Sequence, residues 1–177
     1  MDYFQGIVEN FLRSDRAMFV HGEFLMDLDA NEMEPNGLAL KGRHWYCDVA
    51  AMNMRERTLF LGEVTFSKTL QALTKRLGMW AQVWPDLRAA LSWSAAIPLG
   101  WAIVPWVFIP SESHDLLKRR LVAIENCGNG KDQMPTPRVT FLEDVVPWKY
   151  AEWNNRPSSL DRAAQQVGAA DAASRRG

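Results

Sequence analysis

The sequence predicts an α/β domain with a mixed β-sheet flanked by helices. Two strand-like runs joined by a short polar connection indicate a hairpin. Further strand-like runs then alternate with amphipathic helical segments, which is typical of a layered α/β fold. The 177 residues suffice for one domain with a sizeable core. We expect that domain over residues 1–156 and a tail, helical or disordered, over residues 157–177, where Ala, Gln, Ser and Arg dominate.

Composition narrows the class of protein. The chain is 47% hydrophobic and 23% charged, as in ordinary globular proteins. No apolar run reaches the roughly 18 residues that cross a bilayer, and the first residues lack the basic region of a signal peptide. Cys47 and Cys127 lie far apart in the sequence, which indicates reduced thiols and no zinc site. We therefore expect a cytoplasmic protein without a membrane partner.

Charge is distributed unevenly. The net charge of −1 excludes a strongly basic protein that coats nucleic acid. Residues 1–36 nevertheless carry eight acids and two bases, whereas residues 37–120 carry eleven bases and six acids. The basic middle segment is compatible with a local anionic partner and equally with a solvated basic face.

The first elements follow from apolar spacing. Residues 2–13 place Phe, Ile, Val and Leu on one helical stripe. Residues 17–34 fit either a second helix or a short strand, and "EPNG" ends that segment as a turn. Strands are then expected over residues 42–53 and 58–67, joined by the polar connection "MRER".

The second half continues the alternation. We expect a helix capped by Ser67 or Thr69 that runs to about Trp84, where Pro85 interrupts it. We expect a strand over residues 100–110, and Pro105 within it predicts an edge position in the sheet or a bulge. A helix follows between Ser113 as N-cap and Gly128 as C-cap, and residues 137–148 supply a last strand.

Glu63 lies in the middle of the apolar run Leu59–Phe66. A buried unpaired carboxylate costs several kcal/mol. A hairpin centred on "MRER" pairs positions whose numbers add up to about 111, which predicts that Asp48 and Glu63 lie opposite each other or one diagonal step apart. Directly opposite residues have Cβ atoms about 4.5–5.5 Å apart. Two such acids repel each other, and a divalent cation such as Mg²⁺ would compensate both. The alternative is that Glu63 pairs with a nearby Arg or Lys while Asp48 lies at a sheet edge.

The segment "HWYCDVAAMNMRERTLFLGEVTFSKT" resembles the core of the PD-(D/E)xK nuclease superfamily, which has the restriction-endonuclease-like fold. The resemblance implies a helix, a β-meander, a helix and a further strand. It implies that Asp48, Glu63 and the Val64 carbonyl bind Mg²⁺ or Mn²⁺, with Glu9 as the additional acid of the first helix. The activity implied is phosphodiester hydrolysis by an endonuclease or exonuclease. The implied partner is nucleic acid, DNA in the first place, and the family often forms homodimers.

Two positions depart from the family motif. Cys47 stands where the motif has Pro, and Thr65 stands where it has the Lys that steadies negative charge at the reacting phosphate. Threonine has a hydroxyl but no charge. Lys68, Gln71 and Lys75 lie on one stripe of the following helix. Lys68, which is nearest in sequence, or Lys75 could replace the motif Lys, and Gln71 resembles the helix glutamine of several nuclease branches. The alternative for each is a solvated helix face. Candidates for phosphate contacts are Arg43, Arg55, Arg57 and Arg76.

Two other functions remain open. Thr65 favours a catalytically degenerate domain of this family that binds nucleic acid or protein, and the eight Trp residues fit either a core or an apolar interface. An unrelated α/β enzyme or small-ligand-binding domain is less favoured, because the sequence lacks a Gly-rich phosphate loop and a G-x-S-x-G elbow.

Overall fold

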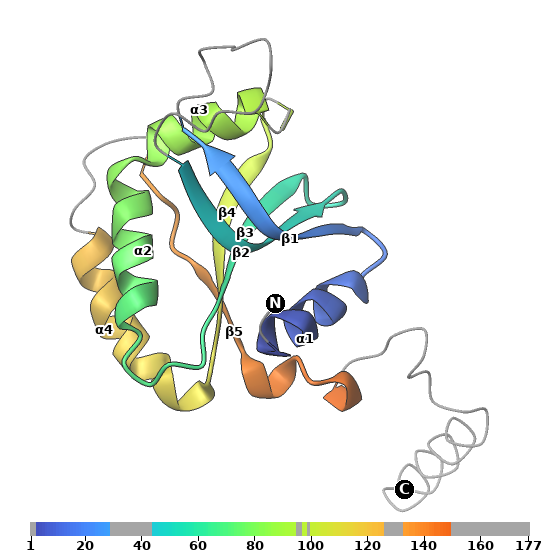
Figure 1. Ribbon diagram of the computed structural model, residues 1–177, viewed down its shortest axis with the longest axis vertical. Coiled ribbons are helices and arrows are strands. Elements are labelled where there is room, and N and C mark those ends of the chain that lie inside the picture. Colours follow the sequence, from blue (N-terminus) through green and yellow to red (C-terminus); the bar gives the residue numbers. More distant parts are fainter. Residues whose placement is uncertain (1–2, 29–43, 95–96, 99, 126–132, 150–177) are drawn as a thin grey trace, which may run out of the picture.

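The strands form one mixed sheet in the order β1-β2-β3-β4-β5 (Figure 1). The computed structural model describes residues 3–28, 44–94, 97–98, 100–125 and 133–149. The strands are β1 (Met18–Asp27), β2 (His44–Asn53), β3 (Thr58–Val64), β4 (Ala102–Ile109) and β5 (Arg138–Phe141). β1, β2 and β3 pair antiparallel, whereas β4 and β5 are added in parallel. The predicted α/β class with a mixed sheet is confirmed.

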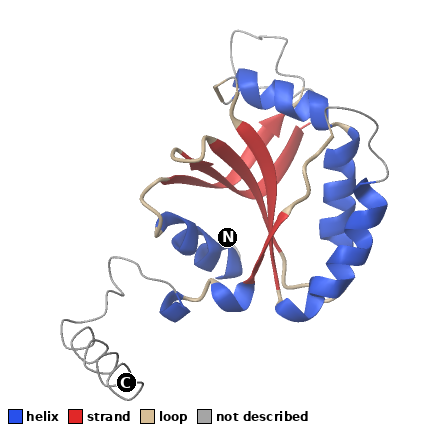
Figure 2. Ribbon diagram, turned by 180° about the vertical axis from the view of Figure 1, so that it is seen from behind, coloured by secondary structure: helices blue, strands red, loops and turns tan. Residues whose placement is uncertain are grey.

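Helices cover both faces of the sheet. They are α1 (Tyr3–Arg13), α2 (Gln71–Gln82), α3 (Trp84–Ser94) and α4 (His114–Glu125). Short 3₁₀ turns cover Ser111–Ser113, Leu142–Asp144 and Pro147–Lys149. Seen from behind in Figure 2, α1 lies on one side of the sheet, and α2 and α4 lie together on the other. Arg43, Cys127, Gly128 and the tail over residues 157–177 lie outside the described residues.

Two apolar layers hold these helices against the sheet. On the α1 face, Val8 and Leu12 pack with Val49, Phe60 and Phe108. On the opposite face, α2, α3 and α4 pack their apolar side chains against β1, β2, β3 and β4. Trp80, Trp84 and Trp106 are each at most 3% exposed. These three Trp residues therefore belong to the core and not to an exposed interface.

The β2–β3 hairpin has the predicted register. Val49 pairs with Gly62 and Asn53 pairs with Thr58, which leaves Asp48 and Glu63 at the next position along both strands. In the connecting turn, the Asn53 side-chain oxygen accepts hydrogen bonds from the Arg55 and Glu56 backbone N–H groups, each at 3.0 Å. The turn chemistry therefore supports the register that brings the two acids together.

Residues 17–34, left open by the sequence, contain β1, because the antiparallel partner β2 supplies its hydrogen bonds. Of that segment, residues 29–34 lie outside the described chain. The predicted cap of α2 is wrong. Leu70 occupies the N-cap position with φ of 50°, while the Ser67 and Thr69 hydroxyls hydrogen-bond each other at 3.1 Å. Pro85 stands near the start of a further helix, α3, which the sequence analysis did not predict.

Pro105 does not mark an edge strand or bulge, because β4 lies between β3 and β5. Pro105 pairs with Leu61 of β3, and the pairing of β4 with β5 begins one residue later, at Trp106. On the β5 side Pro105 therefore has no strand partner within the described sheet. A proline lacks a backbone N–H, so this local end of the pairing explains how an internal strand accommodates it.

Gly62 allows β2 and β3 to approach closely beside the two acids. A Cβ at this position would lie 2.4 Å from Val49 Cγ1 and 3.0 Å from the Val49 carbonyl oxygen. We expect Gly62→Ala to lower the free energy of unfolding by about 1–3 kcal/mol, because Val49 is stiff at χ1. Gly78→Ala in α2 is the control, since its Cβ would meet no described atom within 4 Å, and it should stabilise by about 0.5–1 kcal/mol. Urea unfolding measures both, and equal stability of Gly62→Ala and wild type would contradict the close approach.

Candidate functional site

Asp48 is held by two elements besides its own strand. Its side-chain Oδ2 accepts a hydrogen bond from the Val64 backbone N–H at 2.7 Å. Its backbone carbonyl accepts one from the Gln5 side chain of α1, also at 2.7 Å. A charged acceptor makes the first of these bonds strong. The position of Asp48 is therefore fixed from β3 on one side and from α1 on the other.

Arg76 of α2 lies against both acids. Its Nη1 donates a short hydrogen bond to Glu63 Oε2 and lies 3.6 Å from Asp48 Oδ1. Leu73, Leu77 and Trp80 form the buried stripe of α2. Arg76 lies at the border of that stripe, and its side chain is 38% exposed. The sequence suggested either a cation shared by both acids or an Arg or Lys partner for Glu63, and the structure shows a shared cation that is itself an arginine. Glu63 pairs with an arginine, and Asp48 shares the same guanidinium.

The ion pair with Arg76 only partly compensates the burial of the Glu63 carboxylate. The residue is 3% exposed. Its pKa is raised to about 8, first by burial and then by the charge of Asp48, while Arg76 acts in the opposite direction. Its second oxygen, Oε1, is buried and has no hydrogen-bond partner in the described part of the chain. Arg76 therefore donates a hydrogen bond to only one of the two oxygens of this carboxylate.

Cys47 lies beside the acids and is not suited to nucleophilic chemistry. Burial, and then the charges of Glu63 and Asp48, raise the pKa of its thiol far above the usual range. The thiolate is the reactive form of cysteine, so a thiol kept neutral is inert. Its Sγ donates a hydrogen bond to the Val49 carbonyl oxygen, with 3.5 Å between sulfur and oxygen. We assign Cys47 a packing role.

The donor set fits a hard divalent cation. Asp48 and Glu63 offer two carboxylates, the Val64 carbonyl follows Glu63 directly in the chain, and Glu63 Oε1 has unused lone pairs. Mg²⁺ is commonly held by one or two carboxylates, with waters completing its octahedron. The described residues contain no group of three or more His, Cys, Asp and Glu side chains that could hold a metal ion. A cation here would therefore depend on two protein carboxylates, and Arg76 would have to give way or share them.

Glu9 does not join this group. It forms an ion pair with Arg13 at 3.0 Å, and its Oε1 faces Gly22, where a Cβ would come within 2.4 Å. Glu9 therefore lies between α1 and β1, on the α1 face of the sheet. Asp48 and Glu63 reach Arg76 on the α2 face. The expected additional metal ligand is thus separated from the site by the sheet itself.

The residues expected to assist the two acids from the following helix, and Thr65, are engaged elsewhere or exposed. Lys68 is 82% exposed and pairs with Glu112 at 3.6 Å. Gln71 and Lys75 are exposed on α2, and the Thr65 hydroxyl accepts a hydrogen bond from the Ser67 backbone N–H at 3.1 Å. In the described residues neither lysine forms an ion pair with the two acids. The guanidinium of Arg76 takes the place expected for an ammonium group.

Arg55 and Arg57 lie in the β2–β3 turn, at the opposite end of the hairpin from Asp48. Several strand residues separate them, which corresponds to roughly 17 Å. Arg55 pairs with Asp15 at 3.6 Å. Arg76 is therefore, among the described arginines of the predicted set, the residue that reaches the site.

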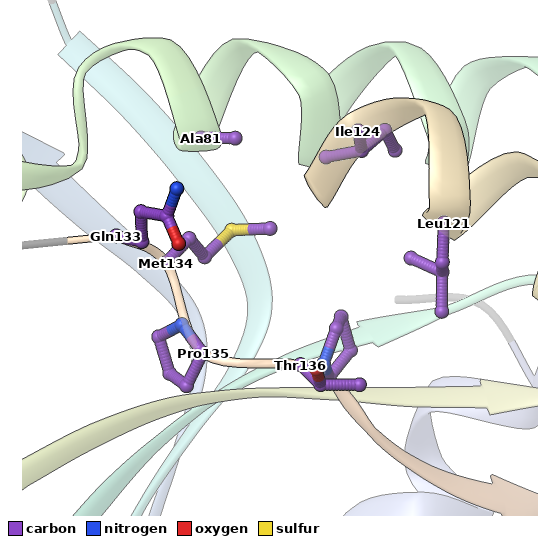
Figure 3. A pocket seen from close by; sticks show the side chains of 8 residues that line it. Ala81, Leu121, Ile124, Gln133, Met134, Pro135 and Thr136 are labelled. Carbon is purple, nitrogen blue, oxygen red and sulfur yellow. The ribbon is translucent and has the colours of Figure 1, made fainter. Parts of the chain in front are cut away.

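Two hollows of about 350 Å³ each lie near α2. One adjoins the site and is lined by His44, Trp45, Tyr46, Arg76 and Met79. The other lies between the C-terminal parts of α2 and α4 and residues 133–137 (Figure 3). Its lining includes neither acid. A small-ligand domain was expected to keep the two acids apart, whereas Arg76 binds both.

Comparison of the chain with protein-family models, curated proteins and solved structures gave no match. Within the described residues, no helix is both long enough and apolar enough to cross a membrane. Any assignment of function therefore depends on the geometry of the site.

The raised pKa of Glu63 predicts a pH-dependent stability. In the unfolded chain Glu63 titrates near 4.5, and in the folded chain near 8. Between these values the folded state binds the extra proton, so the free energy of unfolding falls as the pH rises, by up to about 1.4 kcal/mol per pH unit. Urea unfolding from pH 4.5 to pH 8.5 should show this component in the wild type and not in Glu63→Gln. Identical pH dependence in the two proteins would refute it.

Removal of Arg76 should leave two neighbouring carboxylates without their shared cation. At about pH 8.5 we expect Arg76→Met to lower the free energy of unfolding by about 1–3 kcal/mol, because the buried Glu63 must then either stay charged without its partner or take up a proton. Lys75→Met, the exposed neighbour on the same helix, should change it by less than about 0.5 kcal/mol. Chemical unfolding of both variants decides the point. Similar small effects would mean that the Arg76 bridge contributes nothing to stability.

Proposed function

We propose that the chain is a PD-(D/E)xK-like nuclease that hydrolyses phosphodiester bonds of nucleic acid with Mg²⁺ or Mn²⁺. One observation carries the proposal: two strand carboxylates converge on a single cation position beyond the last pair of the β2–β3 hairpin. The order α1, β1-β2-β3 meander, α2, β4 supports it, because the resemblance implies the same sequence of elements. DNA is the first substrate to test.

Each residue has a distinct role in this proposal. Asp48, Glu63 and the Val64 carbonyl hold the cation, which when bound supplies an activated water and offsets phosphate charge. Arg76 binds the phosphate and supplies the positive charge that Thr65 lacks, since a guanidinium matches phosphate geometry and stays protonated. For the same reason Arg76 cannot accept a proton, so the proton of the attacking water passes to solvent.

A second candidate is a catalytically degenerate domain of the same fold that binds without cutting. The specific observation in its favour is Arg76 itself, whose Nη1 already neutralises both acids. In this function Arg76 replaces the cation permanently. The Thr65 hydroxyl, engaged with the Ser67 backbone N–H, then has no catalytic task.

Hydrolysis of labelled DNA and RNA oligonucleotides with Mg²⁺ or Mn²⁺ tests the proposal. We expect the wild type to cleave, and Asp48→Asn and Glu63→Gln each to lose about 100-fold or more in rate, because the charge contributed through the cation is worth several kcal/mol. Glu56→Gln is the matched control, because Glu56 is an exposed acid in the turn of the same hairpin, and its rate should equal that of the wild type. Cleavage that survives both site substitutions would eliminate this site.

Melting temperature in the presence of the same cations separates the two candidates. A ligand that binds the folded state raises its stability by mass action. The rise with Mg²⁺ should be larger at pH 8.5 than at pH 6, because protons compete for Glu63, whose pKa is about 8. Glu63→Gln should abolish it. Absence of both cleavage and a melting shift in the wild type would favour the degenerate domain.

A further inference from the structure

The hollow beside Arg76 has exposed aromatic walls. His44 and Tyr46 extend from β2 with ring centroids 5.9 Å apart and planes at 88°. Tyr46 is 51% exposed and Met79, from α2, is 38% exposed. Trp45 and Arg76 complete the lining, and Arg76 is its charged member as far as the chain is described. A hollow with flat apolar faces and one guanidinium suits a planar ligand that carries an anionic group.

The spacing along β2 places this hollow about one nucleotide from the acids. Tyr46 precedes Asp48 by two residues on β2, which corresponds to roughly 6–7 Å along the strand. A phosphate bound at Arg76 would thus have its own base, or the adjacent one, within reach of Tyr46. The volume of about 350 Å³ is ample for one base.

A second exposed aromatic group links α1 to the segment that follows β3. Phe4 and Phe66 stack with centroids 4.6 Å apart and planes at 7°, and Phe66 is 56% exposed. Phe4 is adjacent to Gln5, which bonds the Asp48 carbonyl, and Phe66 follows Glu63 by three residues. Exposed aromatic side chains therefore lie near α1 and β3 as well as in the hollow beside Arg76.

We propose that the hollow is a base-binding subsite, in which an unpaired base of a single-stranded nucleic acid stacks on Tyr46 while its phosphate binds Arg76. This inference rests on the proposed function and names its substrate class. In a duplex the faces of each base are covered by its neighbours, so stacking on Tyr46 would require unstacking at a cost of a few kcal/mol. Stacking on aromatic side chains is how proteins hold single strands without reading sequence.

The test is binding without hydrolysis. Fluorescence anisotropy in EDTA, at one fixed salt concentration, compares labelled single-stranded DNA, single-stranded RNA of the same sequence, the DNA duplex, and a single strand with abasic positions. We expect one or both single strands to bind at least about tenfold more tightly than the duplex or the abasic strand, because stacking is worth about 1–3 kcal/mol per base. The DNA and RNA arms identify the sugar that the site prefers.

Substitutions then test whether Tyr46 is the side chain on which the base stacks. Tyr46→Ala should weaken single-strand binding by about 5- to 100-fold and leave binding of the abasic strand unchanged, whereas Tyr46→Phe should retain wild-type affinity. Phe19→Ala is the matched control, because Phe19 is an aromatic residue 60% exposed near the opposite end of the sheet, where it pairs with Met52. Melting temperature checks that each variant is folded.

Two results would overturn the inference: a duplex that binds as tightly as the single strands, or a Tyr46→Ala protein that binds single strands like the wild type. These results do not depend on cleavage. Loss of hydrolysis with intact single-strand binding would reject the proposed nuclease activity and keep the subsite. Hydrolysis that persists without a single-strand preference would keep the nuclease and reject the subsite.

Discussion

The contact of Arg76 with Glu63 and Asp48 is the interaction on which the arrangement of the site depends. Glu63 is almost fully buried, and a carboxylate in such a place requires compensation. Arg76 supplies it from α2, and in doing so it ties the helix to the β2–β3 hairpin. The compensation is incomplete, since Glu63 Oε1 stays without a partner among the described residues. A buried acid that remains partly unsatisfied is a common property of functional sites.

The surrounding fold holds the acids in register. Gly62 lets β3 approach Val49 closely at the pair just before Asp48 and Glu63. Gln5 of α1 and the backbone of Val64 then fix Asp48 from two directions. Side chains supported by packing and by a second layer of hydrogen bonds are held in a defined geometry, as a functional site requires.

One guanidinium serves both functional interpretations of this site. As a phosphate ligand, Arg76 would turn from the acids to the substrate, and a cation held by the acids would then keep the charge of the site balanced. As a permanent counter-ion, it would keep the cation out. The aromatic hollow beside Arg76 is compatible with nucleic-acid binding in either case, because stacking on Tyr46 needs neither a metal nor a general base.

Local periodicity allowed the sequence to determine part of this structure. Alternation along β2 and β3, together with the short turn, was enough to place Asp48 opposite Glu63 on one face, because a strand has a period of two and its turn sets the register. The helical stripes of α1 and α2 followed from apolar spacing in the same way. The α/β class followed from the order of these elements.

The tertiary structure decided the remaining features of the site and the sheet, because these features depend on contacts between segments far apart in sequence. The start of α2 at Gln71, after a left-handed Leu70, set which side chains face the acids, and it selected Arg76 over Lys68 and Lys75. Pairing with β2 turned Met18–Asp27 into a strand. The position of α1 over β1 put Glu9 across the sheet from the site. A short sequence fixes local periods, whereas helix rotation and the face a helix covers are set by the whole core.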